Sequence, residues 1–411
     1  MRGSIKIVGA AALLALASCS SLKDDNAPPD GLTCDHVVNG GGDAPSLTAA
    51  LMNAQSGSCV LVVTQLYSGS FNVPPGVMLA SAKGSRATFT GTDATAPAIT
   101  VGVGGGAWSI DVTHPAQVGI AVRGGAALLH DVFVSSAASA GIAALCTDQS
   151  CHDGAHVLTL EDVRIDGNDT GLWSNGEDVK MSGGECSNNS SQSLTGGNGI
   201  VVFGGAHLAL DGTTVANNDQ VGILLDGASG ATTGTLNAIQ VTSNGSRGIW
   251  AQGLAGTVDA PSLSITGATS ISSNKLVGLG ASDTHGIIFV GGKIDSTTTA
   301  PVLTNLGHSE DVGDGFGVFG DSGDIKLDTV DLTNNARASG LIDESALTSP
   351  PKGVIIFVGG KVAAGASGLQ IVEQHLVSGA PPPQISADLL STPSTTLGFS
   401  APKIALGALL Q

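Results

Sequence analysis

The sequence predicts an all-β solenoid, in which short strands stack coil upon coil. The composition is the first indication: the 411 residues include 60 Gly against 9 Phe, 3 Trp and 1 Tyr, yet 42% are hydrophobic. Aliphatic content of this size argues against a disordered chain and for a core without many aromatic rings. The second indication is a Gly followed by an aliphatic residue, which recurs every 22–30 residues at Gly119, Gly141, Gly171, Gly199, Gly222, Gly248 and Gly278. Such spacing is typical of a solenoid.

The N-terminus is expected to be an export signal. Arg2 and Lys6 precede a ten-residue apolar run, which is too short to span a bilayer. The run ends in Leu16, Ala17, Ser18 and Cys19, which resembles the lipobox of bacterial lipoproteins. The resemblance implies that residues 1–18 are removed and that Cys19 is lipidated. Because Ser20 stands where retained enteric lipoproteins carry Asp, it favours the outer membrane or cell surface.

Residues 19–33 are polar and contain two consecutive prolines, so we expect a flexible tether after the lipidated cysteine. Five further cysteines follow, and an exported protein can form disulfides. Pairing of Cys34 with Cys59 and of Cys146 with Cys151 is one interpretation, and it leaves Cys186 free. A metal site made of Cys146, Cys151, His152 and His156 is the alternative.

Within the repeat, apolar residues alternate, as in Leu208 and Leu210 or Val163 and Ile165, which is the period of strands with one buried face. An Asn precedes most of the Gly anchors, at Asn168, Asn218, Asn244, Asn274 and Asn335. Both Asn and Gly tolerate the left-handed backbone of tight turns. We therefore expect the Asn side chains to stack at a recurring turn and to bond up and down the stack.

Together these features resemble the right-handed parallel β-helix of the pectate-lyase-like superfamily, over roughly residues 46–368. The resemblance implies a short N-terminal capping helix at residues 46–53, within a cap and first coils at 34–100. The repeats proper then occupy 101–368. Residues 369–411, which include the proline run 381–383, are expected to form a C-terminal capping tail. Caps matter because open ends of a stack expose unpaired strand edges.

Function is best sought where the repeat is interrupted. Trp173 and Trp250 each stand two residues after their Gly, and alternation points both rings outward, with Val201 and Leu224 at the equivalent positions between them. Such a stripe predicts a carbohydrate-binding surface, because an exposed apolar stripe usually marks a binding site. The alternative is that loops or the C-terminal tail cover it.

A charged cluster offers the only candidates for catalysis. Arg164 lies among Glu161, Asp162 and Asp166. The resemblance implies that a lyase of this superfamily would use Arg or Lys as its base beside carboxylates, so Arg164, Asp162 and Asp166 are the candidate catalytic residues. The alternative is ordinary solvated surface, which is what charged residues at exposed strand positions form most of the time. Neither the GHG with paired Asp of polygalacturonases nor the signature residues of pectin methylesterases is present.

Charge and ligand chemistry limit the remaining possibilities. The chain has 16 Lys and Arg against 34 Asp and Glu, a formal charge of −18, which makes nucleic acid an improbable partner. No cofactor is expected, although an acidic insert is able to hold Ca²⁺ weakly; it consists of Glu310, Asp311, Asp314, Asp321 and Asp324. The leading hypothesis is a non-catalytic, membrane-anchored, exported protein that binds a polysaccharide or another surface component. The alternatives are a polysaccharide lyase or hydrolase, or a purely structural or adhesive protein.

Overall fold

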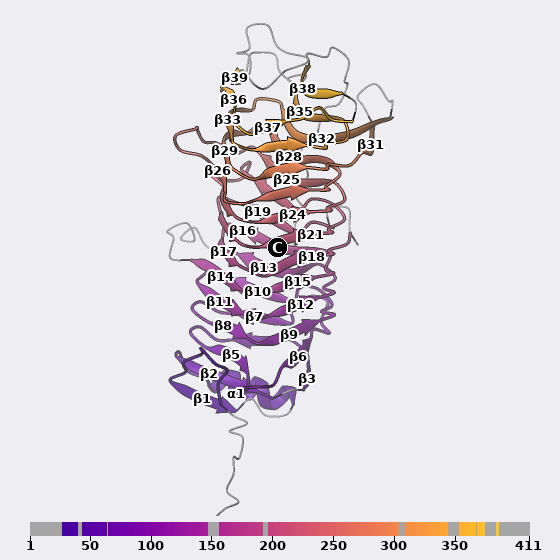
Figure 1. Ribbon diagram of the computed structural model, residues 1–411. Helices are drawn as coiled ribbons and strands as arrows, with labels where there is room; N and C mark the ends of the chain where they lie inside the picture. Colours follow the sequence, from indigo (N-terminus) through magenta and orange to yellow (C-terminus); the bar gives the residue numbers. More distant parts are fainter. Residues whose placement is uncertain are drawn as a thin grey trace, which may run out of the picture.

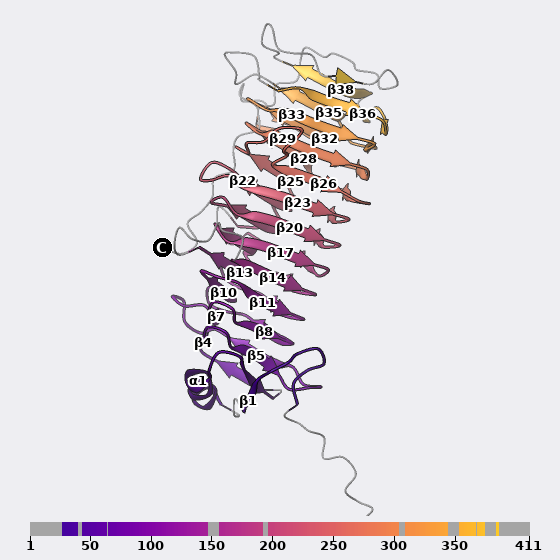
Figure 2. The same ribbon diagram turned by 90° about the vertical axis from the view of Figure 1, so that its left-hand side faces the viewer.

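The protein is a parallel β-helix. The computed structural model describes residues 27–39, 43–63, 65–146, 156–191, 196–303, 309–343, 353–366, 368–374 and 384–385. Within them the strands form three long sheets, and each sheet runs the full length of an elongated column (Figures 1 and 2). Each full coil passes through sheet C, then sheet A, then sheet B, so strands three places apart in the chain pair in parallel.

The three sheets have the following members. Sheet A contains β1 (His36–Asn39), β2 (Ser58–Val62), β5 (Met78–Ser81), β8 (Gly106–Trp108), β11 (Ala127–His130), β14 (Val157–Glu161), β17 (Asp178–Ser182), β20 (His207–Asp211), β23 (Thr233–Asn237), β26 (Leu263–Thr266), β29 (His285–Val290), β33 (Gly323–Asp328), β36 (Ile355–Val358) and β39 (Gln384–Ile385). Sheet B contains β3 (Leu66–Ser68), β6 (Ala87–Thr90), β9 (Ile110–Thr113), β12 (Phe133–Ser135), β15 (Arg164–Asp166), β18 (Glu185–Ser187), β21 (Thr214–Ala216), β24 (Gln240–Thr242), β27 (Ser270–Ser272), β30 (Lys293–Asp295), β34 (Asp331–Thr333) and β37 (Lys361–Val362). Sheet C contains β4 (Phe71–Val73), β7 (Ile99–Val101), β10 (Ile120–Arg123), β13 (Ala140–Leu145), β16 (Thr170–Asn175), β19 (Ile200–Phe203), β22 (Ile223–Asp226), β25 (Arg247–Gln252), β28 (Leu276–Ser282), β32 (Ser309–Phe319), β35 (Ala338–Asp343), β38 (Leu369–Gln374) and β31 (Ala300–Leu303), the last antiparallel to β32.

The core is a shaft of aliphatic side chains. In sheet C one inward position carries a branched aliphatic residue on five successive coils, at Ile142, Leu172, Ile200, Ile223 and Ile249, all fully buried. Burying such a side chain contributes about 1.5–3 kcal/mol, but a single coil has no second layer to bury it against. Stability therefore comes from neighbouring coils, as the repeat and its alternation predict.

The predicted Asn ladder is confirmed between sheets B and C. The Asn189 side-chain amide donates to Asn218 Oδ1 (2.6 Å), Asn218 to Asn244 (2.8 Å) and Asn244 to Asn274 (2.8 Å). All are buried, so each bond satisfies a polar group that water cannot reach. Asn189 was not among the predicted members because no Gly anchor follows it at the usual short distance. Thr297 takes the place between Asn274 and Asn335, and its backbone N–H donates to Asn335 Oδ1 (3.2 Å).

The N-terminal cap is also confirmed. Helix α1 (Ala44–Asn53) begins two residues before the predicted start, because Asp43 accepts a hydrogen bond from the Ser46 backbone N–H (2.7 Å) and caps it. It packs on β1, β2 and β4. No helix in the described ranges is long and apolar enough to cross a membrane.

The structure corrects both ends of the predicted domain map. Residues 27–33 are not a free tether: Asp30 pairs with Lys83 (2.6 Å), and Leu32 packs beside Cys59 and Trp108. The signal peptide, Cys19 and the rest of the predicted tether lie outside the described residues. At the other end, β38 and β39 still pair within sheets C and A, so the coils continue past residue 368. The remaining residues of the predicted tail lie outside the described part.

Candidate functional site

The predicted tryptophan stripe faces outward from the shaft, as alternation requires, but it is not exposed. Trp173, Val201, Leu224 and Trp250 are direct partners on four successive strands of sheet C. Their exposed fractions are only 4% for Trp173 and 0% for the other three. The expectation of an open carbohydrate-binding stripe is therefore wrong, because a large apolar surface on a sheet is stabilised by being covered.

The two rings are held by neighbours on the same face. Trp173 meets the edge of Phe203, with ring centroids 4.9 Å apart. The Trp250 indole N–H donates to Gln252 Oε1 (3.0 Å), and the Arg247 guanidinium lies 4.3 Å from the ring centre. The indole N–H and the π face of Trp250 are thus already engaged, and both rings belong to a second apolar cluster outside the shaft.

The predicted charged cluster is exposed and does assemble. Arg164, more than half exposed, projects from β15 and lies 3.5 Å from Asp166 and 3.9 Å from Glu185. Its guanidinium also lies over the Phe133 ring, 5.4 Å from the centre. Asp162 occupies the turn before β15, with a left-handed backbone (φ 52°), and lines the same hollow as Arg164. The three predicted residues therefore share one corner of the column.

Coil stacking adds a second arginine that the sequence did not reveal. Arg86 Nε lies 2.5 Å from Asp111 Oδ1 and Arg86 Nη1 lies 2.9 Å from Asp131 Oδ2. Burial acts to lower the pKa of Arg86, but hydrogen bonds and the charges of Asp111 and Asp131 outweigh it and raise that pKa. The three residues come from three successive coils, and only the strand register brings them together.

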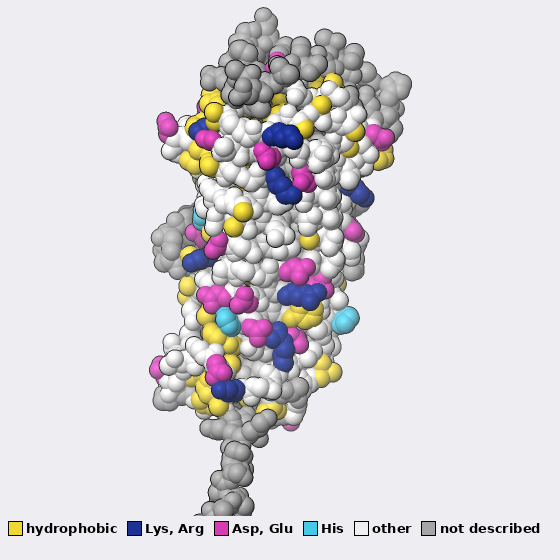
Figure 3. Space-filling view, viewed as in Figure 1, with side chains coloured by type: hydrophobic (Ala, Val, Ile, Leu, Met, Phe, Trp, Pro, Cys, Tyr) yellow, Lys and Arg dark blue, Asp and Glu magenta, His cyan; other side chains and the backbone are white. Residues whose placement is uncertain are grey.

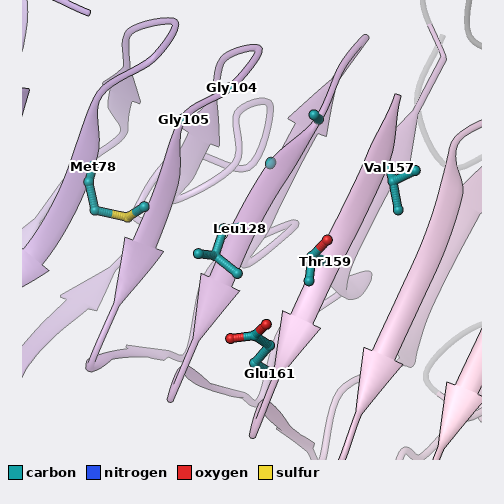
Figure 4. A pocket seen from close by; sticks show the side chains of 9 residues that line it. Met78, Gly104, Gly105, Leu128, Val157, Thr159 and Glu161 are labelled. Carbon is teal, nitrogen blue, oxygen red and sulfur yellow. The ribbon is translucent and has the colours of Figure 1, made fainter. Parts of the chain in front are cut away.

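Beside this group, sheet A presents a histidine between an aromatic ring and a carboxylate. His130 Nδ1 lies 3.1 Å from Glu161 Oε2, and the His130 ring packs on Trp108 with centroids 3.9 Å apart. Glu161 also borders a hollow of about 460 Å³ together with Met78, Leu128 and Thr159 (Figure 4). A His held by a carboxylate at the edge of a hollow is able to accept or donate a proton.

The two hollows adjoin along one edge of the column. The second, of about 360 Å³, lies around the turn from the first, since Asp131 and Asp162 follow His130 and Glu161 directly in the chain. Figure 3 shows side chains of both charges gathered on this side. We call this surface the A–B corner; it consists of Arg86, Trp108, Asp111, His130, Asp131, Phe133, Glu161, Asp162, Arg164, Asp166 and Glu185.

The acidic insert, which was the weak candidate for Ca²⁺, is spread over different surroundings in the structure. Asp314, from the acidic insert, is fully buried and its carboxylate pairs with Arg337. Asp321 and Asp324 flank His285 at 3.7 and 3.9 Å. Asp311 is exposed, and the side chain of Glu310 lies outside the described part of the chain. Among the described residues no group of three His, Cys, Asp or Glu is placed to hold a metal ion.

The cysteines have structural positions. Cys34 and Cys59 form a disulfide, as predicted, and disulfides are a feature of exported proteins. Cys146 is also disulfide-bonded, which removes it from the alternative metal site; Cys151 and His152 lie outside the described residues. Cys186 is free and replaces an aliphatic residue of the sheet B core column. Burial raises its pKa to about 12, so it is not a reactive thiol.

Comparison with known proteins agrees with the fold. The family model for the right handed beta helix region matches residues 118–294. Among solved structures, the A-module of the Azotobacter vinelandii mannuronan C-5 epimerase AlgE4 has a TM-score of 0.54 and 16% identity, over 89% of this chain and 99% of that one. A double mutant of the periplasmic alginate epimerase AlgG has a TM-score of 0.53 and 11% identity, over 89% and 84%. No curated protein matches by sequence. The chain thus has the fold of a right-handed parallel β-helix.

Proposed function

We propose that the protein binds a polysaccharide along the A–B corner. The observation that carries this proposal is the pair of adjoining hollows: the smaller is lined by the Phe133 ring beside charged groups, and the larger is lined by apolar side chains beside Thr159 and Glu161. Sugars present an apolar face that packs on rings and hydroxyls that bond to carboxylates and guanidinium groups. The proposal moves the binding surface from the buried tryptophans of sheet C to the exposed edge between the other two sheets.

The charges at the corner favour a neutral polysaccharide over a polyuronate. Six carboxylates (Asp111, Asp131, Glu161, Asp162, Asp166 and Glu185) face two guanidinium groups, and both guanidinium groups lie beside carboxylates of the protein itself. Two like charges 4 Å apart repel by about 1 kcal/mol even in water, and by more near a protein surface. A chain of uronates would meet that repulsion at several sugars.

A retention assay tests this proposal. Mature protein is passed over immobilised neutral glucans, galactans and a polyuronate, and the bound fraction is compared with that of Phe133→Ala and of the control Lys293→Gln, an exposed position of sheet B outside the corner. We expect retention on a neutral polysaccharide that Phe133→Ala weakens and Lys293→Gln does not. Absence of retention on every neutral polysaccharide, or equal retention of both variants, would overturn the proposal.

A second candidate function is cleavage of the bound polysaccharide, by a lyase or a hydrolase. The observation that favours it is the His130–Glu161 pair at the edge of the larger hollow. Product analysis for new reducing ends and for unsaturated ends separates the two functions. Products that appear with the wild type and disappear in His130→Gln would assign an enzyme; binding without products supports a non-catalytic role.

We also propose that the exported protein is anchored to a membrane through Cys19, in the outer membrane or at the cell surface. Because residues 27–33 pack on the N-terminal coils, only the chain from Cys19 to Ala27 is left as a spacer. Eight residue steps reach about 26–29 Å at most. The N-terminal cap would then stand close to the membrane. Cys19→Ala should release the protein from the membrane fraction, and its retention there would contradict the anchor.

A further inference from the structure

The outer face of sheet C carries a continuous apolar row. One outward position runs in register through ten strands, and every residue in it is apolar or Gly: Ala121, Ala143, Trp173, Val201, Leu224, Trp250, Gly280, Gly317, Leu341 and Val372. The eight residues with side chains are between 0% and 4% exposed. We call this set the sheet C row.

The Trp250 ring lies over the neighbouring strand of the row. A Cβ atom at Gly280 would collide with the Trp250 ring, and one at Gly317 would collide with the ring of Phe319. Gly280 therefore leaves room for the Trp250 ring over the next strand, and Gly317 leaves room for the Phe319 ring of its own strand. The result is a long, shallow apolar floor of the kind on which an extended chain segment is able to pack.

The described elements do not explain why this floor is buried. Every described strand belongs to one of the three sheets or pairs at the β31–β32 edge, and α1 packs on β1, β2 and β4 at the N-terminal end. The partly buried residues next to the row, such as Leu145 and Phe203, are two positions further along the same strands and so share its face. An outward row this free of solvent needs a segment lying on it.

We propose that the chain's own C-terminal segment, residues 386–411, packs along the sheet C row. Of its 26 residues only Asp388 and Lys403 are charged, and its last part reads Ile404-Ala405-Leu406-Gly407-Ala408-Leu409-Leu410. Disordered segments have many charged and few apolar residues, whereas this segment has few charged and many apolar residues. Its composition is therefore that of a segment that packs against an apolar surface. Its composition matches the row, whereas the outward position of sheet B carries Arg164, Glu185, Thr214 and Gln240 on four successive strands.

The reach of the segment is sufficient. It begins after β39, at the C-terminal end of the column, where β35 and β38 carry the last residues of the row. From Leu341 to Ala121 the row crosses eight strand spacings, or about 38 Å. Twenty-six extended residues span about 86 Å, so the segment is able to turn from sheet A to sheet C and still follow the row.

Deletion of residues 386–411 tests the proposal. Two of the three tryptophans lie in the row, so the truncated protein should show a red shift of tryptophan emission and stronger fluorescence of a hydrophobic dye, while far-ultraviolet circular dichroism stays that of a β protein. A synthetic peptide of residues 386–411 should reverse both changes saturably. Unchanged emission and dye binding in the truncated protein would overturn the proposal.

A full-length variant covers the case in which the truncated protein does not fold. Leu406→Asp with Leu409→Asp keeps the chain length and should give the same red shift, whereas Lys403→Gln, which leaves the apolar residues intact, should not. Wild-type emission in the double variant would again overturn the proposal. So would a red shift that appears only on dilution, together with dimers in sedimentation at high concentration, because it would assign the row to a second copy of the chain.

Discussion

The outer faces of sheets B and C are built on the same backbone and have opposite surroundings. In sheet B the outward position runs through Phe133, Arg164, Glu185, Thr214 and Gln240, in part or fully open to water. In sheet C the corresponding position is the sheet C row, which is buried. Alternation along a strand therefore tells which way a side chain points from the shaft, but it does not tell whether that face of the sheet is open to water or covered.

The difference also separates the binding surface from the stabilising one. The A–B corner has its charges in pairs at the edge of solvent, where ion pairs contribute little to stability and remain available to a ligand. The sheet C row contains no charged residue, and it contributes to the stability of the fold because its apolar side chains are buried. Substitutions on the two faces should accordingly change different properties, and the buried polar groups between the strands should have effects of intermediate size.

The largest effect is expected from a charge placed in the row. Leu224→Asp buries a carboxylate among apolar groups and should lower the free energy of unfolding by about 3–5 kcal/mol. Gln240→Asp, at the exposed outward position of sheet B in the same coil, should change it by less than about 0.5 kcal/mol. Denaturant unfolding midpoints measure both. Equal, small changes would mean that the row is open to water.

Breaking the Asn ladder should lower the free energy of unfolding by less than Leu224→Asp does, because no charge is placed among apolar groups. Asn218→Ala removes the oxygen that accepts from the Asn189 side-chain amide, which keeps only the weaker bond to Cys186 Sγ (3.5 Å), and it also removes the donor to Asn244. A buried group left unsatisfied costs about 1–3 kcal/mol. Its neighbour Asn217 is exposed and left-handed (φ 56°), so Asn217→Gly should be close to neutral. Thermal unfolding of the two variants compares them, and a neutral Asn218→Ala would remove the ladder from the stabilising interactions.

These contrasts explain how much the sequence could predict. The sheets, the capping helix and most of the ladder follow from a local repeat, and local patterns are visible in a sequence. Arg86, Asp111 and Asp131 meet only because three coils stack in one register, which the variable spacing of the Gly anchors conceals. The burial of Trp173 could not be predicted either, since it depends on what lies over the sheet and not on the strand itself.

A buried carboxylate near sheet C should make stability depend on pH. Glu177, in the turn after β16, is fully buried; burial, with a smaller contribution from the charge of Asp178, raises its pKa to about 8 from 4.5. Between these values the folded protein binds more protons than the unfolded chain, so stability should fall as pH rises from 5 to 8.

Two isosteric variants test this prediction, one at Glu177 and one at an exposed control position. Glu177→Gln should unfold at a higher temperature than the wild type at pH 8 and should lose most of the fall between pH 5 and 8. Asp259→Asn, at an exposed position, should keep the wild-type dependence. A wild-type slope in Glu177→Gln would show that Glu177 is not the titrating group.

The smallest effects on stability should come from the A–B corner, and there the two arginines should differ. Arg86 bonds to the carboxylates of Asp111 and Asp131 and to the Asp131 backbone carbonyl, so it links three coils, and Arg86→Gln should cost about 1.5 kcal/mol. Arg164 is more exposed and its nearest carboxylate oxygen is 3.5 Å away. Arg164→Gln should therefore leave the unfolding midpoint nearly unchanged, by less than about 0.5 kcal/mol, while weakening retention on polysaccharide. A large loss of stability in Arg164→Gln would mean that Arg164 stabilises the fold. An arginine that serves only to bind a ligand should contribute little to the stability of the ligand-free protein.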